Sequence, residues 1–324
     1  MPDVEATDLE RMRAELFFDG AKAASKRSRF WLLLPLSAVI ATAGVISDST
    51  ATVIGAMIVA PLMTPILGAA LAIALGDWRN LIRSLLFVVT GAMAVFAIAY
   101  VFASMLDFEV VAQSNSQVAA RVAPHLVDLV AALATGAVGA VALARSDISD
   151  TLPGVAIAIS LVPPLAVVGV TAQAKAYHQA AGALLLFVTN VVAIVLSGLV
   201  VLAVYRLNRR ARPGTLRRRT AATVAVVLAA VAIGVPLAHS SHEVGRTTAL
   251  LQGVGRVAQI WTKGSSYAVE TVTISGGEVL VRIIGAGSPP STETFRHELD
   301  GAGLGATSVE VQVVPAVTTE LPGH

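Results

Sequence analysis

The sequence contains no cysteine, and only 14% of its 324 residues are charged. The absence of cysteine excludes disulfides and thiolate-bound metals and leaves the redox compartment open. The chain also has no P-loop, nucleophile elbow or HExxH motif. Its apolar stretches lack the paired histidines and carboxylates that catalysis inside a membrane needs. We therefore expect neither enzymatic activity nor a cofactor.

Apolar residues are abundant instead, at 55% of the chain with a mean hydropathy of +0.75. This excess over soluble domains must be covered by lipid. The apolar residues gather in runs long enough to cross a hydrocarbon core of roughly 30 Å. The runs cover residues 30–47, 51–75, 84–106, 124–144, 152–174, 180–205 and 220–238. The prediction is an α-helical polytopic membrane protein with about seven transmembrane helices.

The first 29 residues are polar, and their many acidic side chains are unlike a cleaved signal peptide. Thr7 and Glu10 have the spacing of a capping box. The apolar residues that follow recur at helical spacing: Leu9, Met12, Leu16 and Phe17. This segment is predicted to form a short amphipathic helix on the cytoplasmic side.

Basic residues set the predicted orientation, because cytoplasmic loops are enriched in lysine and arginine. Alternate crossings place most of them on the side of the N-terminus: Lys22, Lys26, Arg27, Arg29, Arg79, Arg83, Arg145 and the arginine-dense segment 206–219. The opposite loops hold Arg121 and Lys175. The N-terminus is then cytoplasmic and the C-terminal domain extracytoplasmic, in the cell (inner) membrane. This distribution favours topology anchors over nucleic-acid binding, with an anionic-lipid or partner site at 206–219 as the alternative.

An internal repeat relates two parts of the chain. Residues 47–68 read SDSTATVIGAMIVAPLMTPILG, and residues 149–169 read SDTLPGVAIAISLVPPLAVVG. Spans 1–3 begin inside and spans 4–6 begin outside, so the copies would be related by a pseudo-two-fold axis in the membrane plane. Inverted repeats with proline-interrupted helices are typical of secondary transporters and indicate the substrate site.

The prolines provide the chemistry of this prediction. Each proline removes an N–H and clashes with the carbonyl one turn back, so the pairs Pro61/Pro65 and Pro163/Pro164 leave carbonyls unpaired at depth. Neighbouring helices, the hydroxyls of Thr64 or Ser160, water or a bound ion can supply the missing partners. Simple kinks, which membrane helices tolerate, are an equally weighted alternative.

Further polar residues complete the candidate site. Asp48 and Asp150 are candidate cation ligands or proton carriers, although Asp and Ser at span starts also favour helix capping. Asn190 either lines a polar path or bonds a neighbouring helix. The candidate transport-site residues are Asp48, Ser49, Pro61, Thr64, Pro65, Asp150, Ser160, Pro163, Pro164 and Asn190. His239, His242 and Glu243 lack a fourth ligand, and no metal site is predicted.

In the C-terminal segment 239–324 the pattern of apolar residues changes from helical spacing to alternation. Residues alternate around 269–274 and 279–283 on either side of Gly276-Gly277, which indicates a β-hairpin. A helix over 291–300 and a third strand over 309–313 follow, and a helix over 243–262 precedes, giving the order αββαβ. The expected roles are oligomerisation, ligand sensing, gating or structural capping, and a homo-oligomer is expected.

Two motifs carry a resemblance to a known family. VIGAMIVAPLMTPILG (53–68) and GVAIAISLVPPLAVVG (154–169) resemble the bacterial and archaeal hydrophobic membrane proteins known as domain of unknown function 389. The resemblance covers about residues 30–210, and the motif positions are Gly55, Ala56, Met57, Pro61, Leu62, Met63, Pro65, Pro163 and Pro164. It implies a polytopic prokaryotic membrane protein with a small αβ extension and no known substrate.

The leading functional hypothesis is a carrier or channel for a small ion or polar solute, with its midplane site where the two proline-interrupted spans cross. The alternative is a non-transporting scaffold or signalling protein that presents the C-terminal domain. Re-entrant second and fifth spans are a second topology, which the distribution of arginines disfavours.

Overall fold

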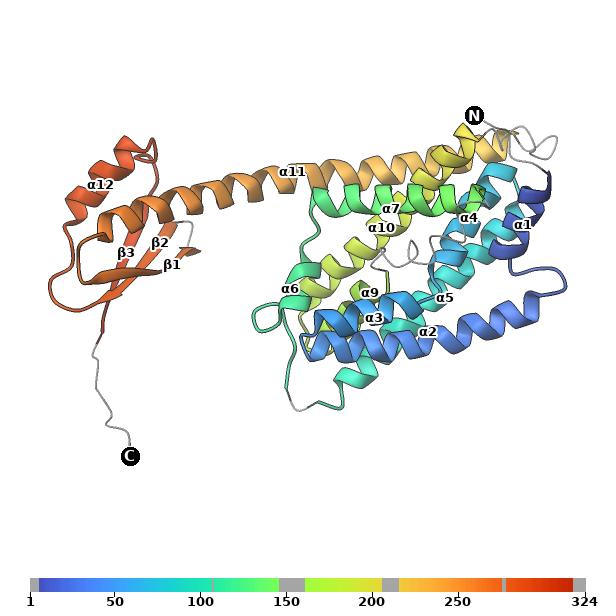
Figure 1. Cartoon of the computed structure of the whole chain (residues 1–324), viewed down its shortest axis with the longest axis horizontal. Coiled ribbons are helices and arrows are strands. Elements are labelled where there is room, and N and C mark those ends of the chain that lie inside the picture. The colour runs from blue at the N-terminus through green and yellow to red at the C-terminus, as the bar shows by residue number, and fades with distance from the viewer. Residues whose placement is uncertain (1–5, 107, 146–160, 206–215, 276–277, 317–324) are drawn as a thin grey trace. The chain divides into compact units, whose positions relative to one another are not determined.

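The computed structural model describes residues 6–106, 108–145, 161–205, 216–275 and 278–316 (Figure 1). The chain divides into two compact units, Met1–Ala238 and His239–His324. The division falls within the helix α11 (Leu216–Thr262). Two predicted site residues, Asp150 and Ser160, lie outside the described residues.

The first unit is helical. Its remaining helices are α1 (Ala6–Leu16), α2 (Ala23–Ile46), α3 (Thr50–Val59), α4 (Met63–Leu75), α5 (Trp78–Ala103), α6 (Ser116–Val122), α7 (Leu126–Ala144), α9 (Val162–Gln173) and α10 (Tyr177–Val204). Within the described residues, α2, α5, α7 and α10 are long and apolar enough to cross a membrane. The bent pair α3–α4 makes a fifth if it is one span. The predicted span 152–174 is described only from residue 161 onward, where α9 follows.

The helix α5 shows how these helices meet both protein and lipid. One face is buried through residues spaced at helical intervals, such as Val88, Val95 and Ala99. Large apolar side chains on the other face are exposed, with Leu86 at 57% and Met93 at 66%. An amphipathic surface helix of a soluble protein would carry polar residues there, so this apolar outer face indicates contact with lipid.

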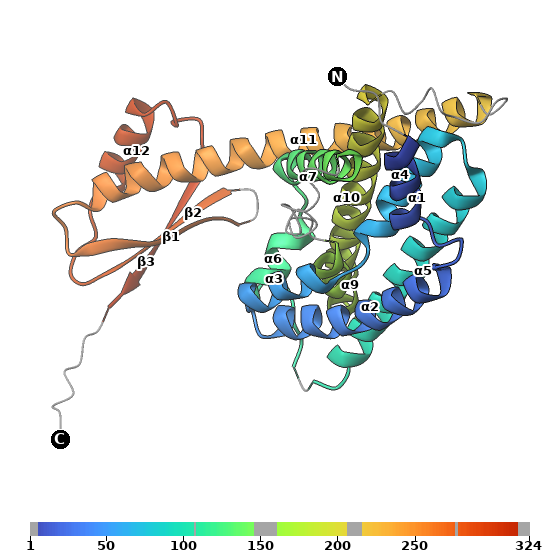
Figure 2. The same cartoon turned by 45° about the vertical axis from the view of Figure 1, so that its right-hand side comes forward.

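Two shorter helices, α4 and α9, are buried inside the unit. Every residue from Pro65 to Leu75 in α4 is buried, as is every residue from Val162 to Thr171 in α9. The helix α4 packs against α5 and α10, and α9 packs against the same two helices (Figure 2). The four-helix arrangement of α4, α5, α9 and α10 therefore forms the centre of the unit, with α2 against α5 and α9 and with α7 against α10.

The N-terminal helix α1 is amphipathic, as the sequence predicts. Leu9, Met12 and Leu16 are buried, and the helix contacts α4 and α7. Glu10, the predicted partner of Thr7 in a capping box, pairs with Arg13 at 3.7 Å, and the residues before Ala6 lie outside the described part of the chain. The apolar spacing was informative because it reports burial, whereas the cap depends on where the helix begins.

The second unit contains a three-stranded sheet in the order β1-β2-β3. β1 (Tyr267–Ser275) and β2 (Glu278–Gly285) are antiparallel, and β2 is parallel to β3 (Val309–Pro315). The helix α12 (Thr292–Gly301) connects β2 to β3. Alternate residues of β2 enter a separate core with Phe295 and Leu299 of α12 and Trp261 of α11. The order of elements is the predicted αββαβ; Gly276 and Gly277 lie outside the described residues.

Candidate functional site

The first proline pair interrupts the predicted second span. The helix α3 ends at Val59, Ala60 is extended at φ −66° and ψ 125°, and α4 begins at Met63. The extended conformation follows because a proline disfavours helical geometry in the residue before it. The axes of α3 and α4 differ by 49°. Pro61 thus separates two half-helices.

Pro65 does not interrupt the span, contrary to the prediction. It lies in the first turn of α4. Backbone N–H groups in that turn have no intrahelical partner, so the missing N–H of a proline costs little there. The interruption comes from Pro61, which has no N–H to donate to the carbonyl of Met57 one turn back.

The second proline pair marks the start of a helix. α9 begins at Val162, and Pro163 and Pro164 occupy its first turn, the position that favours proline. α4 has 13 residues and α9 has 12, so each is about 20 Å long or less. Neither reaches across a hydrocarbon core of about 30 Å. Both helices are followed by polar turns, beyond Gly76 and Ala174. With these turns at the membrane surface, the N-terminal ends of α4 and α9 lie within the hydrocarbon core.

The remaining interior candidates lie on the same central helices. Thr64 is half-buried in the first turn of α4, next to the break. Asn190 is buried on α10, which packs against both α4 and α9. The neighbouring Thr189 donates from its hydroxyl to the carbonyl of Leu185 at 2.7 Å. Thr189 therefore bonds its own helix. Asn190 lies on α10, which packs against both half-helices, α4 and α9.

Asp48 and Ser49 are separate from this interior group. They precede α3, whose 10 residues span about 15 Å. Ser49 is the N-cap of α3 and accepts a bond from the N–H of Thr52 at 3.3 Å. The capping role that the sequence left open therefore holds for Ser49. The predicted site divides into an interior group around Pro61 and a turn at the start of α3.

Asp48 binds a different helix from the one it precedes. Its φ of 52° is left-handed, and its Oδ1 accepts bonds from the hydroxyl of Ser116 at 2.8 Å and from the N–H of Gln117 at 2.9 Å. These groups begin α6. Asp48 thus caps α6 across the connection between α2 and α3, an arrangement that its neighbours in sequence do not reveal.

Asn115 is a structural residue that the sequence analysis missed. It is buried, and its Oδ1 caps α6 by accepting from the N–H of Val118 at 2.9 Å. Its Nδ2 donates to the carbonyl of Val45 at 2.7 Å, near the end of α2. The signal was the Asn-Ser pair at 115–116, which is typical of a helix start. Asp48 and Asn115 together attach α6 to the turn between α2 and α3.

The carboxyl of Asp48 gives this attachment a pH dependence. The hydroxyl of Ser116, followed by the N–H of Gln117, lowers the pKa of Asp48 below its ordinary 3.8. A depressed pKa stabilises the folded state above the unfolded value, and that stability disappears as the pH falls through the folded pKa. We expect the melting temperature of the wild type to fall toward that of Asp48→Asn below about pH 4, with their difference constant from pH 5 to 7. Asparagine is the matched variant because it tolerates the left-handed backbone and does not titrate; a difference that is unchanged at pH 3 would contradict the assignment.

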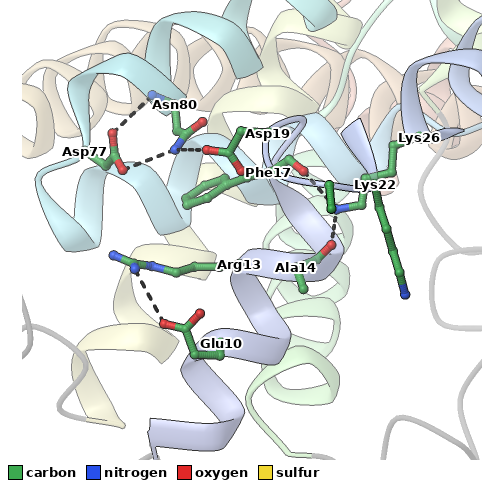
Figure 3. A pocket seen from close by; sticks show the side chains of 11 residues that line it. Glu10, Arg13, Ala14, Phe17, Asp19, Lys22, Lys26, Asp77 and Asn80 are labelled. Atoms are coloured by element: carbon green, nitrogen blue, oxygen red, sulfur yellow. Dashed lines mark hydrogen bonds and ion pairs between the residues drawn. The ribbon is translucent and has the colours of Figure 1, made fainter. Parts of the chain in front are cut away.

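A cleft lies between the N-terminal segment and the turn from α4 to α5 (Figure 3). Its volume is about 510 Å³. Asn80 lies in one wall of the cleft, and its Nδ2 donates to Asp19 at 3.0 Å and to Asp77 at 3.1 Å. Lys26 donates to the carbonyl of Phe17 at 2.8 Å. The cleft is therefore bounded by bonds between the N-terminal segment and the membrane helices.

Metal ligation finds no support within the residues that the structure describes. Those residues contain no cluster of three or more histidines, cysteines, aspartates or glutamates placed to hold a metal ion. The prolines, hydroxyls and amide at the interior group offer backbone carbonyls and neutral oxygens instead.

Comparisons with known proteins cover this interior region. Residues 57–196 match the family model described as Domain of unknown function (DUF389), which confirms the resemblance seen in the two motifs. An uncharacterised protein of Methanocaldococcus jannaschii is 31% identical over 205 residues. The aligned part is 63% of this chain and 63% of that relative. No solved structure matches the chain. The family match extends from α3 to α10 and includes both proline pairs.

Proposed function

The chain carries the domain of unknown function DUF389 across residues 57–196, and we propose that this domain is a carrier or channel for a small ion or polar solute. In this proposal the chain crosses the cell membrane seven times, with a cytoplasmic N-terminus and an extracytoplasmic C-terminal domain. It acts as a homo-oligomer in the bilayer, without a cofactor, an enzymatic step or nucleic acid. The observation that carries the proposal is the burial of two half-length helices, α4 and α9, that carry prolines in their first turns.

The packing of these helices supports an inverted repeat. α4 follows the first proline pair and packs against α5 of its own repeat and α10 of the other. α9 follows the second pair and packs against α10 of its own repeat and α5 of the other. A two-fold relation between spans 1–3 and 4–6 predicts this exchange of partners, and inverted repeats with broken helices are common among secondary transporters.

The break at Pro61 offers chemistry suited to a small polar solute. Pro61 has no N–H for the carbonyl of Met57 one turn back, whereas the N–H groups of Thr64 and Ile66 already donate to the carbonyls of Pro61 and Leu62, so the break offers mainly carbonyl acceptors. Such groups require partners in a membrane interior. Thr64 adds a hydroxyl at the break, and Asn190 lies buried on α10. Carbonyl acceptors together with a hydroxyl favour a small ion or a polar solute that donates hydrogen bonds.

Substitution of the prolines tests the transport proposal. Pro61→Ala restores an N–H that can bond the carbonyl of Met57 and thereby removes one ligand of hydrogen-bond strength, so it is expected to change flux into reconstituted vesicles by about tenfold. Pro163→Ala, in the first turn of α9, is expected to change flux by less. Flux is measured with a panel of monovalent ions, divalent ions and small zwitterions. Pro35→Ala is the matched control, because Pro35 lies inside the continuous helix α2 and its removal should leave flux unchanged. Equal flux in all three variants would contradict the midplane site, provided that each variant elutes from gel filtration as a folded protein.

The second candidate function is a membrane-anchored scaffold or signalling protein. The observation that favours it is the C-terminal unit, which has its own core around β2 and α12. If the protein is a scaffold, reconstituted vesicles should show no flux of any solute, and the C-terminal unit should still bind its partner.

A further inference from the structure

The cleft beside the turn from α4 to α5 is lined by charged side chains of both signs. Its volume of about 510 Å³ is within the range of small-molecule sites. The charged residues that line it are acidic Glu10, Asp19 and Asp77 and basic Arg13, Lys22 and Lys26. Their formal charges cancel, so the cleft is matched by neither a simple anion nor a simple cation. A ligand that fits it carries both charges.

Asn80 builds the acidic wall of the cleft. Its Nδ2 donates to both Asp19 and Asp77, and Asn80 and Asp77 are each only 6% exposed. One neutral amide therefore holds two carboxylates on the same wall. Arg83 approaches Asp19 only to 4.0 Å, and a carboxylate can accept about four hydrogen bonds. Asp19 thus keeps acceptor capacity for a cationic donor.

The basic wall lies on the side of α2, apart from Asp19, Asn80 and Asp77 (Figure 3). Nζ of Lys26 is already used, because it donates to the carbonyls of Ala14 and Phe17 at the end of α1. Lys22 is exposed and makes no hydrogen bond or ion pair within the described residues. Lys26 therefore fixes this wall, and the ammonium of Lys22 remains available to an anionic group.

The acidic wall lies where α5 begins to face lipid. Asp77 is the N-cap of α5 and Asn80 lies in its first turn. Trp78 between them is exposed, and the exposed apolar side chains of α5 start at Ile82 and Leu85. Exposed tryptophans are typical of the boundary between membrane and water. The cleft is therefore at the level of lipid headgroups.

We propose that the cleft binds a zwitterionic phosphoethanolamine group, with its ammonium at Asp19 and Asp77 and its phosphate at Lys22. This chemistry occurs both in a phospholipid headgroup and in the free phosphate ester. A primary ammonium donates hydrogen bonds to the acidic wall, whereas a quaternary ammonium is held by a cage of aromatic rings. Phe17 is the one aromatic residue among the described residues that line the cleft. The proposal does not depend on transport and applies equally to a scaffold.

Ligand binding to the full chain in neutral detergent tests this site. Phosphoethanolamine is expected to raise the melting temperature saturably, by about 3 °C at ten times its dissociation constant. Phosphocholine has the same phosphate but cannot donate from its quaternary nitrogen, so it should cause no shift. An equal shift with inorganic phosphate or with ethanolamine alone would overturn the zwitterion site, as would the absence of any shift.

Two variants assign the ends of the ligand. Lys22→Gln should weaken phosphoethanolamine binding about fivefold, the effect of one partly exposed ionic contact. Asp19→Asn keeps an acceptor for Asn80 and should weaken phosphoethanolamine binding by the same factor. Arg27→Gln is the matched control, because Arg27 is exposed on α2 and does not line the cleft. Its affinity should equal that of the wild type in 0.15 M salt, where charges beyond about 8 Å are screened. Unchanged affinity in both cleft variants would overturn the assignment.

Short-chain lipids below their micellar concentration identify the source of the group. Tighter binding of dihexanoyl phosphatidylethanolamine than of phosphoethanolamine supports a lipid headgroup. Loss of binding when the acyl chains are present supports a free zwitterion in the same cleft. Dihexanoyl phosphatidylglycerol has the phosphate without the ammonium, and affinity equal to that of the phosphatidylethanolamine would overturn the proposal in favour of an anion site.

Discussion

Gly169→Ala is expected to lower the free energy of unfolding by about 3 kcal/mol, at the upper end of the usual cost of overpacking. An added Cβ would lie 2.6 Å from Cβ of Ala99, 2.7 Å from the carbonyl oxygen of Phe96 and 2.8 Å from the nitrogen of Tyr100. Two of these atoms belong to the backbone of α5 and cannot rotate away. The measurement is thermal unfolding of detergent-solubilised protein, followed by fluorescence-detected gel filtration.

Gly55→Ala is the matched control for this variant. Gly55 lies inside α3, and nothing comes within 4 Å of a Cβ built there. The same substitution should therefore be neutral or stabilise the protein by up to about 1 kcal/mol, the difference in helix propensity. If the two variants melted alike, α9 would not pack closely against α5, and the exchange of partners between the repeats would lose its main contact.

Asn115→Ala is expected to cost about 2–3 kcal/mol of unfolding free energy. It removes the N-cap of α6, worth about 1 kcal/mol, and it leaves the carbonyl of Val45 without its bond from Nδ2, worth a further 1–2 kcal/mol or so. The loss is measured in the same unfolding assay.

Asn115→Asp divides this cost into its two parts. The carboxylate can still cap α6 but cannot donate to Val45, so the variant should lie between the wild type and Asn115→Ala. An aspartate variant as stable as the wild type would show that the bond to the end of α2 contributes nothing. A loss in Asn115→Asp equal to that in Asn115→Ala would remove the capping role.

Gly169→Ala and Asn115→Ala both disturb contacts between segments that are distant in sequence. Such contacts are the ones that sequence patterns predict least well. Asp48 shows the difference. Its place ahead of an apolar run predicts a cap for α3, yet Ser49 caps α3 and Asp48 caps α6. A capping residue is identified by its composition, but the helix that it caps depends on which N–H groups the fold brings within reach.

The sequence by itself determined the local features of this protein. Apolar runs, the alternation in β1 and β2, and the break at Pro61 follow from hydration and backbone chemistry within a few residues. The tertiary structure alone decided that α4 and α9 are central while α5 faces lipid on one side, and that α1 lies on α4. The reason is that lipid and protein interior are equally apolar, so a buried half-helix and a lipid-facing span have the same hydropathy and differ only in their neighbours.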